Sequence, residues 1–284
     1  MARRAAHAAR KAGLRRLAVD IGNTNTVLGL FEDGAIARRW RLSTRRDATV
    51  DEIALSLQGL LRAGWDDEGI VAAGLASVVP VLDDVWARAM ESVLGRSPEV
   101  LDWSNCLGLK LDYEIPRQIG ADRLANVLGA QALGHREGVV VDLGTATTFD
   151  VFGQGTYWGG IICPGIQTSL RTLVQNAAKL SEVELRWTDK FVGKTTDDAL
   201  CIGILHGTLG QVEHLLAAIV AERRMKAPSI IATGGLAPLL AGRSHSIRLI
   251  EPDLTLIGIN HLLEAGSTPA AAGPRRGSAK GHKT

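Results

Sequence analysis

Two aspartates that each follow an apolar segment and precede a glycine are the residues of this sequence best suited to chemistry. Asp20 follows three apolar residues of strand character and is followed two positions later by Gly22, and Asp142 stands in the same relation to Gly144. Glycine lets a turn approach a ligand closely, and the amide and hydroxyl groups beside it can donate to phosphate oxygens. A carboxylate at such a turn can hold the metal ion that travels with a nucleotide. One such turn is equally typical of an ordinary hairpin, whereas two of them, separated by about the length of a domain, indicate a duplicated phosphate site.

Two further positions have residue types that fit the same chemistry. The apolar segment 230–232 leads into the pair Gly234 and Gly235, and paired glycines after a strand leave room for an adenine ring on the backbone. Asp122 stands at the start of an expected helix. On residue type alone it is a first-turn carboxylate that stabilises the helix by about 1 kcal/mol. The alternative is a general base for a substrate hydroxyl, a role in phosphoryl transfer where position matters more than base strength.

The pattern of apolar residues predicts two similar halves. Each half opens with three antiparallel strands around an Asp-x-Gly turn, at 16–42 and at 138–162. Further helices are expected at 50–62, 81–94, 120–133, 166–178, 197–223 and 253–263, and further strands at 69–79 and 229–232. This alternation favours an α/β fold of mostly parallel sheets, with two duplicated domains and a ligand cleft between them. The expected domains are 17–133 and 134–265, flanked by a basic extension at 1–16 and a disordered tail at 266–284.

The charges and the composition exclude some classes of partner. The 284 residues are 46% hydrophobic and 22% charged, which is the balance of a soluble globular protein. Ten of the 32 basic residues lie in the two acid-free terminal segments, so the body carries 22 basic against 30 acidic residues. An acidic body argues against nucleic acid as a partner, because phosphate backbones need a basic face. No apolar run approaches the roughly 20 residues of a membrane helix, so no membrane is expected. The three widely spaced cysteines without a secretory signal favour the cytoplasm.

Taken together, the motifs resemble those of type III pantothenate kinases. The resemblance rests on five segments that occur in the order of the family and cover roughly residues 17–265. They are Asp20-Ile21-Gly22-Asn23-Thr24, Tyr113 followed by Gly120-Ala121-Asp122-Arg123, Asp142-Leu143-Gly144-Thr145-Ala146-Thr147, Gly193-Lys194-Thr195-Thr196 and Ala232-Thr233-Gly234-Gly235-Leu236-Ala237. The first segment alone indicates only the superfamily of sugar kinases, acetate kinase and actin, whereas the Gly-Ala-Asp-Arg and Asp-x-Gly-Thr-Ala-Thr segments are specific to this family. The resemblance implies two duplicated actin-like domains of the acetate and sugar kinase superfamily.

The resemblance also implies an activity and a set of site residues. The activity is ATP-dependent phosphorylation of pantothenate to 4'-phosphopantothenate, the first step of coenzyme A biosynthesis. ATP would bind to Asp20, Ile21, Gly22, Asn23, Thr24, Asn25, Thr26, Val27 and Thr145. Pantothenate would contact Tyr113, Gly120, Ala121, Asp122, Arg123 and Thr196, with Asp122 as the catalytic proton acceptor. Asp142 would hold a monovalent cation, K⁺ or NH₄⁺, which neutralises part of the phosphate charge, while Mg²⁺ accompanies ATP.

Members of the family are homodimers, so a second copy of the chain is an expected partner. Gly203, Gly207 and Gly210 recur on one side of the long helix and would permit close approach to another helix. Packing of this side against its own domain is equally compatible with the sequence. His206 stands where the family usually has tyrosine, which leaves the local contact open. Two other functions remain open: a catalytically weak regulatory or accessory protein on the same fold, and another small-molecule kinase of the superfamily.

Overall fold

Two mixed sheets form the framework of the structure. The computed structural model describes residues 14–62, 69–177 and 180–267, and most of the two expected terminal extensions lies outside this part. The first sheet contains β1 (Arg15–Ile21), β2 (Asn25–Glu32), β3 (Ala35–Ser43), β4 (Ile70–Ser77) and β5 (Glu99–Val100). The second contains β6 (Lys110–Leu111), β7 (Glu137–Leu143), β8 (Ala146–Gly153), β9 (Thr156–Pro164), β10 (Ser229–Thr233) and β11 (Leu249–Ile250).

The two sheets share one topology. The first has the order β3-β2-β1-β4-β5, and the second read from its other end has the order β9-β8-β7-β10-β11, with β6 added beside β9. In each, the three sequence-adjacent strands are antiparallel and the following two are parallel to the central strand. The sheets are therefore mixed rather than mostly parallel, because tight turns join the first three strands and only the later ones need a helical crossover. The predicted division of the chain between residues 133 and 134 stays a prediction.

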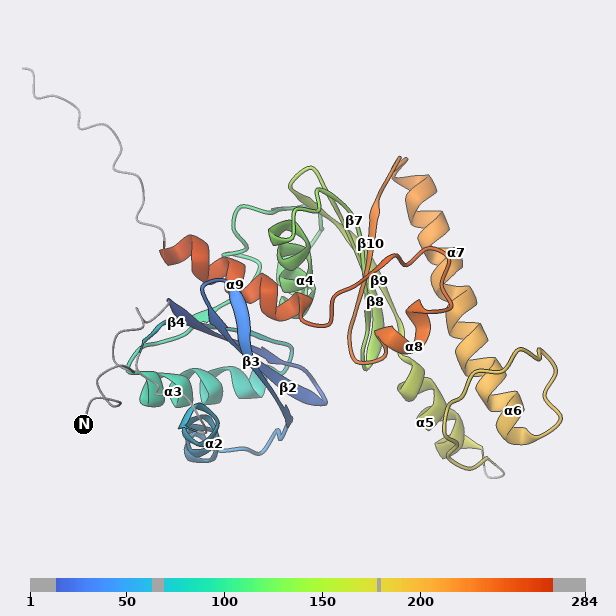
Figure 1. Ribbon diagram of the computed structural model, residues 1–284, viewed down its shortest axis with the longest axis horizontal. Helices are drawn as coiled ribbons and strands as arrows, with labels where there is room; N and C mark the ends of the chain where they lie inside the picture. The colour runs from blue at the N-terminus through green and yellow to red at the C-terminus, as the bar shows by residue number, and fades with distance from the viewer. Residues whose placement is uncertain (1–13, 63–68, 178–179, 268–284) are drawn as a thin grey trace, which may run out of the picture.

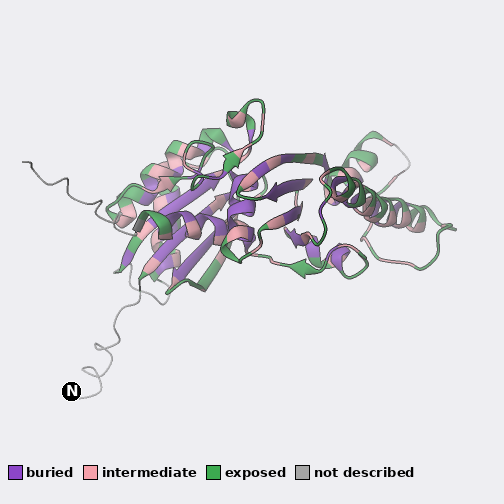
Figure 2. Cartoon of the chain, turned by 90° about the horizontal axis from the view of Figure 1, so that it is seen from above, coloured by how far each residue is buried: buried purple, intermediate pink, exposed green. Residues whose placement is uncertain are grey.

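Helices cover the outer face of each sheet and fill the layer between them (Figure 1). The helices α2 (Val50–Arg62) and α3 (Asp83–Leu94) cover the first sheet, α4 (Ala121–Ala132) and α9 (Leu254–Ser267) lie between the sheets, and α5 (Ile166–Asn176), α7 (Gly207–Glu222) and α8 (Ala237–Ala241) cover the second sheet. The short helix α6 (Thr196–Cys201) continues through a π-helical turn (Ile202–His206) into α7. Figure 2 shows that the strands are largely buried while the outer faces of the helices are exposed.

Alternation of side chains along β1 and β7 places the two aspartates in the middle layer. Val19 packs with residues of α2 and α3, whereas Ala18 packs with residues of α4 and α9. Successive side chains of a strand point to opposite faces, so Asp20 lies on the same face as Ala18. Val140 of β7 also packs in the middle layer, which puts Asp142 on that side of the second sheet. Both carboxylates therefore face the layer that contains α4 and α9.

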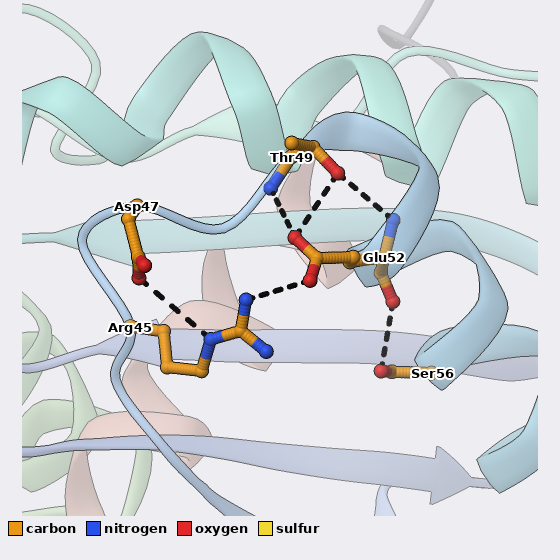
Figure 3. A network of polar contacts seen from close by, with 5 residues as sticks. All are labelled: Arg45, Asp47, Thr49, Glu52 and Ser56. Carbon is orange, nitrogen blue, oxygen red and sulfur yellow. Dashed lines mark hydrogen bonds and ion pairs between the residues drawn. The ribbon is translucent and has the colours of Figure 1, made fainter.

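The start of α2 is fixed by a capping box (Figure 3). The Glu52 carboxylate accepts hydrogen bonds from the Thr49 amide at 2.8 Å and from its hydroxyl at 3.1 Å, and the Glu52 amide donates to the Thr49 hydroxyl at 3.4 Å. Arg45 donates to the other Glu52 oxygen at 2.7 Å and pairs with Asp47. Reciprocal bonds of this kind satisfy the free amides of a helix start. The contacts of Arg45 also hold the segment 44–48, which lies beside the turn at Gly22 and Asn23.

The helical run Thr196–Glu222 is long and apolar enough to span a membrane when judged by length and composition alone. Core helices of soluble proteins pass the same test. Here Leu205, Val212 and Leu216 are buried in the cluster on the outer face of the second sheet. The expectation of no membrane therefore rests on composition and stays a prediction.

Candidate active site

Both aspartate turns open into one cleft between the sheets. The cleft has a volume of about 620 Å³ and is lined from both halves of the chain. The lining includes these residues of the predicted ATP, catalytic and metal sets: Asp20, Gly22, Asn23, Thr24, Asn25, Val27, Asp122, Asp142 and Thr145. The structure thus brings together residues that are more than 100 positions apart in the sequence.

The first turn is braced by the segment that follows β3. The Gly22 amide donates to the Asn25 carbonyl at 3.0 Å, and a Cβ on Gly22 would lie only 3.0 Å from that same oxygen. The Thr44 hydroxyl donates to the Gly22 carbonyl at 2.7 Å, and Arg46 donates to the Asn23 side chain at 2.8 Å. The turn is therefore held in shape before any ligand binds. Thr44 and Arg46 carry no motif that sequence analysis could have found.

The second turn is packed against the paired glycines after β10. The Leu236 amide donates to the Leu143 carbonyl at 3.1 Å. Gly234 has a φ of +87°, and a Cβ there would overlap the Asp142 carboxylate and lie 2.7 Å from the Leu143 carbonyl carbon. Glycine is required at this position both by the left-handed backbone and by the close packing. The three turns singled out in the sequence therefore meet at one place.

Asp122 lies in the first turn of α4 and reaches the same cleft. Its Oδ1 accepts a hydrogen bond from the Arg123 amide at 2.7 Å. A Cβ on Gly120 would lie 2.5 Å from the same Oδ1, so a glycine before the helix makes room for the carboxylate. Asp122 is thus both a first-turn residue that favours the helix dipole and a cleft residue, and the two interpretations of the sequence are compatible.

All three cleft carboxylates have raised pKa values, chiefly because they are buried. The pKa of Asp20 is well above its ordinary value because of burial first and of the charges on Asp122 and Asp142 second. Burial and the Asp122 charge raise the pKa of Asp142 to about 6, and a hydrogen bond from Asn126 opposes this. Burial also raises the pKa of Asp122, against the Arg123 amide and guanidinium. A group of half-buried carboxylates with raised pKa values is a favourable place for a cation, which relieves their repulsion.

Arg123 points away from the cleft into a buried polar cluster. Its guanidinium donates to Asp150 Oδ1 at 2.6 Å and to the Phe149 carbonyl at 3.2 Å, and Tyr157 donates to the same Asp150 oxygen at 3.1 Å. Asp150 is fully buried, and its Oδ2 has no partner in the described part of the chain. A Cβ on Gly160 would overlap both the Arg123 guanidinium and the Phe149 carbonyl. Sequence analysis missed Asp150, Tyr157 and Gly160, since nothing in their spacing links them to residue 123.

Besides Arg123, six predicted residues do not line the cleft: Ile21, Thr26, Tyr113, Gly120, Ala121 and Thr196. Ile21 is buried against α2 and α3, and the buried Thr26 bonds to the Thr44 hydroxyl at 3.0 Å. Tyr113 lies over β9, with its ring centre 6.2 Å from that of Tyr157. Thr196 is exposed at the start of α6, far from α4 (Figure 1). Ile21 and Thr26 follow strand alternation, which turns them away from the ligand side.

Two arginines in the cleft lining were also not predicted. Arg41 on β3 lines the cleft from the first half of the chain, and Arg171 on α5 lines it from the second half. Within the described residues, neither side chain has a hydrogen bond or an ion pair. Arg39 also lines the cleft but pairs with Asp253 at 3.0 Å. Arg41 and Arg171 are therefore the lining cations with charge available for an anionic ligand.

Comparison with known proteins places these residues in a family. The family model described as type III pantothenate kinase matches residues 16–218. The chain belongs to the type III pantothenate kinase family. A type III pantothenate kinase of Desulfosudis oleivorans is 42% identical over 246 residues, which are 86% of this chain and 96% of that one. One of Anaeromyxobacter sp. (strain K) is 40% identical over 250 residues, which are 87% of this chain and 98% of that one.

Solved structures support the fold. A Campylobacter jejuni structure named for the Baf family of transcriptional activators has a TM-score of 0.55 at 21% identity, covering 88% of this chain and 98% of that one. The ROK hexokinase of Thermus thermophilus has a TM-score of 0.50 at 16% identity, covering 89% and 100%. At these identities the likeness concerns the fold alone. The predicted class, two actin-like α/β halves of the sugar kinase kind, is confirmed.

Proposed function

We propose that this type III pantothenate kinase transfers the γ-phosphoryl group of ATP to the terminal hydroxyl of pantothenate, the first step of coenzyme A biosynthesis. The observation that carries the proposal is the position of Asp122 in the same cleft as both phosphate turns. A nucleotide held by the turns would place its terminal phosphate near the carboxylate that follows Gly120 and Ala121. The shared cleft of Asp20, Asp122 and Asp142 supports the kinase over a regulatory protein.

The residues divide between holding phosphates and accepting a proton. The backbone amides of the two turns, together with the hydroxyls of Thr24 and Thr145, donate to phosphate oxygens. Asp122 accepts the proton of the pantothenate hydroxyl as the oxygen–phosphorus bond forms, and ADP departs with the electrons of the broken bond. Burial raises the pKa of Asp122, which brings it closer to that of a useful base. Charge stabilisation and position supply most of the rate in such transfers.

Kinases of this class use ATP with Mg²⁺, and the residues present fit a metal ion. Asp20 lines the cleft beside the first turn, and Mg²⁺ is usually bound by one or two carboxylates together with substrate phosphates. Asp142 is the residue we assign to the monovalent cation, K⁺ or NH₄⁺. Its raised pKa and its closeness to the glycine turns at 144 and 234 support this assignment. Bound cations would neutralise charge that builds up on the transferring phosphate.

A homodimer formed through the long helix is also part of the proposal. A Cβ on Gly203, Gly207 or Gly210 would meet no described atom within 4 Å, so this side of the helix is open rather than packed on its own domain. Phe191 lies in the loop before α6, is 74% exposed, and has its ring centre 4.6 Å from that of His206. An open small-residue face beside an exposed aromatic ring supports contact with a second copy.

Thr196 fits the proposed pantothenate site only in such a dimer. Thr196 begins α6, which lies far from α4 in one chain (Figure 1). In a dimer formed through the open helix face, α6 of one copy would approach the cleft of the other. Sedimentation of the purified protein tests the dimer. Mixing an Asp122→Asn chain with a Thr196→Ala chain tests the shared site, because regained activity requires residues from two copies.

We place the reaction in the cytoplasm, in line with the bacterial relatives.

The test of the function is ADP release from ATP in the presence of pantothenate. We expect pantothenate-dependent turnover that is higher in KCl than in NaCl at equal ionic strength. Absence of pantothenate-dependent ADP release in KCl would contradict the kinase assignment and favour a regulatory role. A sugar or acetate that outcompetes pantothenate as acceptor would instead identify another kinase of the superfamily.

A further inference from the structure

Asn126 links the cleft carboxylate Asp142 to the last helix of the chain. Its Nδ2 donates to Asp142 Oδ2 at 3.2 Å, and its Oδ1 accepts from the Thr255 hydroxyl at 2.7 Å. Asn126 is 1% exposed, so no water competes for either end of its amide. Thr255 lies on α9, separated from Asn126 by 129 positions. The two hydrogen bonds connect Thr255 of α9, through Asn126 of α4, to the Asp142 carboxylate.

Two glycines let α4 and α9 approach closely enough for these two hydrogen bonds to form. A Cβ on Gly129 of α4 would overlap the Leu254 carbonyl, and a Cβ on Gly258 of α9 would overlap the Ala125 carbonyl. The helix backbones are therefore in direct contact at the point where Asn126 follows Ala125 and Thr255 follows Leu254. At that separation the short threonine side chain reaches the amide. Any larger residue at either glycine would separate the helices and break the bond.

The polarity of the two bonds fixes the orientation of the amide. A carboxylate can only accept, so the Asp142 side of the amide has to be the NH₂ group. The opposite end is then a buried carbonyl oxygen, which needs a donor, and the Thr255 hydroxyl supplies it. A rotated amide would set its carbonyl oxygen against the carboxylate. Thr255 thus stabilises the one orientation that holds Asp142 Oδ2.

The other oxygen of Asp142 lies beside the backbone of two glycines that line the cleft. A Cβ on Gly234 would overlap Asp142 Oδ1, and a Cβ on Gly144 would lie 3.4 Å from it. Both glycines line the cleft. With Oδ2 held by Asn126, Oδ1 is the oxygen directed to the place where the two turns meet.

We propose that Thr255 and Asn126 are positioning residues that direct Asp142 Oδ1 to the monovalent cation. The proposal rests on the function proposed above, in which Asp142 holds that ion. Partners that orient a ligating carboxylate typically affect ion affinity or activity by 10- to 100-fold. Asp142 would remain without them, but its carboxylate would rotate among several orientations.

The experiment compares three variants with matched shape. Thr255→Val removes the hydroxyl and keeps the branched side chain, whereas Thr255→Ser keeps the hydroxyl. Thr255 is half-buried and lines the cleft, whereas Thr147→Val makes the same change at a fully buried threonine, whose hydroxyl has no partner in the described part of the chain. For each protein, the K⁺ concentration that gives half-maximal pantothenate phosphorylation is measured, with choline chloride keeping the ionic strength constant. The rise in melting temperature with K⁺ is measured in the absence of substrates.

We expect Thr255→Val to raise the half-maximal K⁺ concentration by about tenfold or more and to shift the melting-temperature response to higher K⁺ equally. Thr255→Ser and Thr147→Val should respond to K⁺ as the wild type does. A lower melting temperature of Thr255→Val with an unchanged K⁺ response would overturn the proposal, since the bond would then only dock α9. Wild-type protein that is stabilised by K⁺ but does not phosphorylate pantothenate would refute the proposed function alone, and the melting-temperature series would still decide the role of Thr255.

Discussion

The hydroxyl groups of Thr24 and Thr145 lie 3.0 Å apart and share a hydrogen bond across the cleft. The two residues belong to the two phosphate turns and are 121 positions apart. In the absence of a nucleotide, the groups that would donate to phosphate oxygens therefore satisfy each other. A bound triphosphate would replace this neutral bond by bonds to charged oxygens, which are about twice as strong.

Thr145→Val should weaken the use of ATP without affecting the acceptor. A hydrogen bond to a charged group contributes about 1.5–3 kcal/mol, so kcat/KM for ATP should fall by about 10- to 100-fold. The KM for pantothenate should stay unchanged. Steady-state kinetics with each substrate varied in turn measures both, with Thr172→Val on α5 as the matched control. An unchanged kcat/KM for ATP would mean that the Thr145 hydroxyl serves only to close the empty cleft.

Asp122→Asn should lower turnover by about 100-fold or more and leave ATP binding intact. The amide keeps an oxygen that can accept from the Arg123 amide, so the first turn of α4 should remain in place. Isothermal titration with ATP and a denaturation curve serve as controls for binding and folding. Near-normal turnover would reduce Asp122 to a residue that stabilises the start of the helix.

The elements and the first half of the site could be predicted because their signals are local. The three-strand pattern around Asp20 was predicted at 16–42, and β1, β2 and β3 occupy Arg15–Ser43. The turn at Asp142 and the glycines before Leu236 carry equally local signals. The strands β5, β6 and β11 were missed because two residues cannot show alternation. The three antiparallel strands of each half were predicted, whereas the expectation of mostly parallel sheets was wrong because helix–strand alternation does not show how many strands pair antiparallel.

The contacts that position the site could not be predicted because they join distant parts of the chain. The bond from Thr255 to Asn126 exists only because α9 returns to the middle layer and meets α4 at two glycines. The pairing of Arg123 with Asp150 likewise depends on α4 packing against β8. An isolated Asn or Asp in an apolar segment gives no indication of its partner. Sequence motifs therefore indicate many of the residues that line the cleft and miss the residues that position them.

Asp142→Asn should stabilise the ligand-free protein at neutral pH while impairing its response to K⁺. The folded-state pKa of Asp142, about 6, lies above the ordinary value of 3.8. Its contribution to stability is therefore present below about pH 4 and is lost as pH rises through 6. The neutral amide avoids this loss, so the free energy of unfolding at pH 7 should rise by about 1–3 kcal/mol, with a difference near zero at pH 4. Urea denaturation at both pH values, without added ATP, checks this. A variant that is less stable than wild type at pH 7 would contradict it.

Gly160→Ala should disrupt the cluster around Arg123. The new methyl group would overlap both the Phe149 carbonyl and the Arg123 guanidinium. Because the carbonyl belongs to the sheet backbone, the guanidinium has to move, and its bond to Asp150 is strained. We expect a loss of about 1–3 kcal/mol of stability together with a higher KM for pantothenate. Gly59→Ala on α2 is the matched control, because a Cβ there meets nothing within 4 Å and should stabilise the helix by up to about 1 kcal/mol. If Gly160→Ala changed stability and the KM for pantothenate no more than Gly59→Ala does, the backbone around Gly160 would be able to shift and make room for the methyl group.

Arg41→Ala should weaken binding of the triphosphate part of ATP. Arg41 enters the cleft from β3, with its Nη1 3.8 Å from the position of a Cβ on Gly235, so it lies beside the turn proposed for the nucleotide. Its charge has no partner among the described residues, and a phosphate oxygen would supply one. The KM for ATP should rise by about tenfold, and inhibition by inorganic tripolyphosphate should weaken to the same extent. Inhibition by adenosine, which has no phosphate, should be unchanged. Arg38→Ala is the matched control, since Arg38 lies on the same strand and pairs with Leu30 on the α2 side of the sheet. If adenosine inhibition weakens while tripolyphosphate inhibition is unchanged, Arg41 contacts the base rather than the phosphates, and its charge is then not what binds ATP.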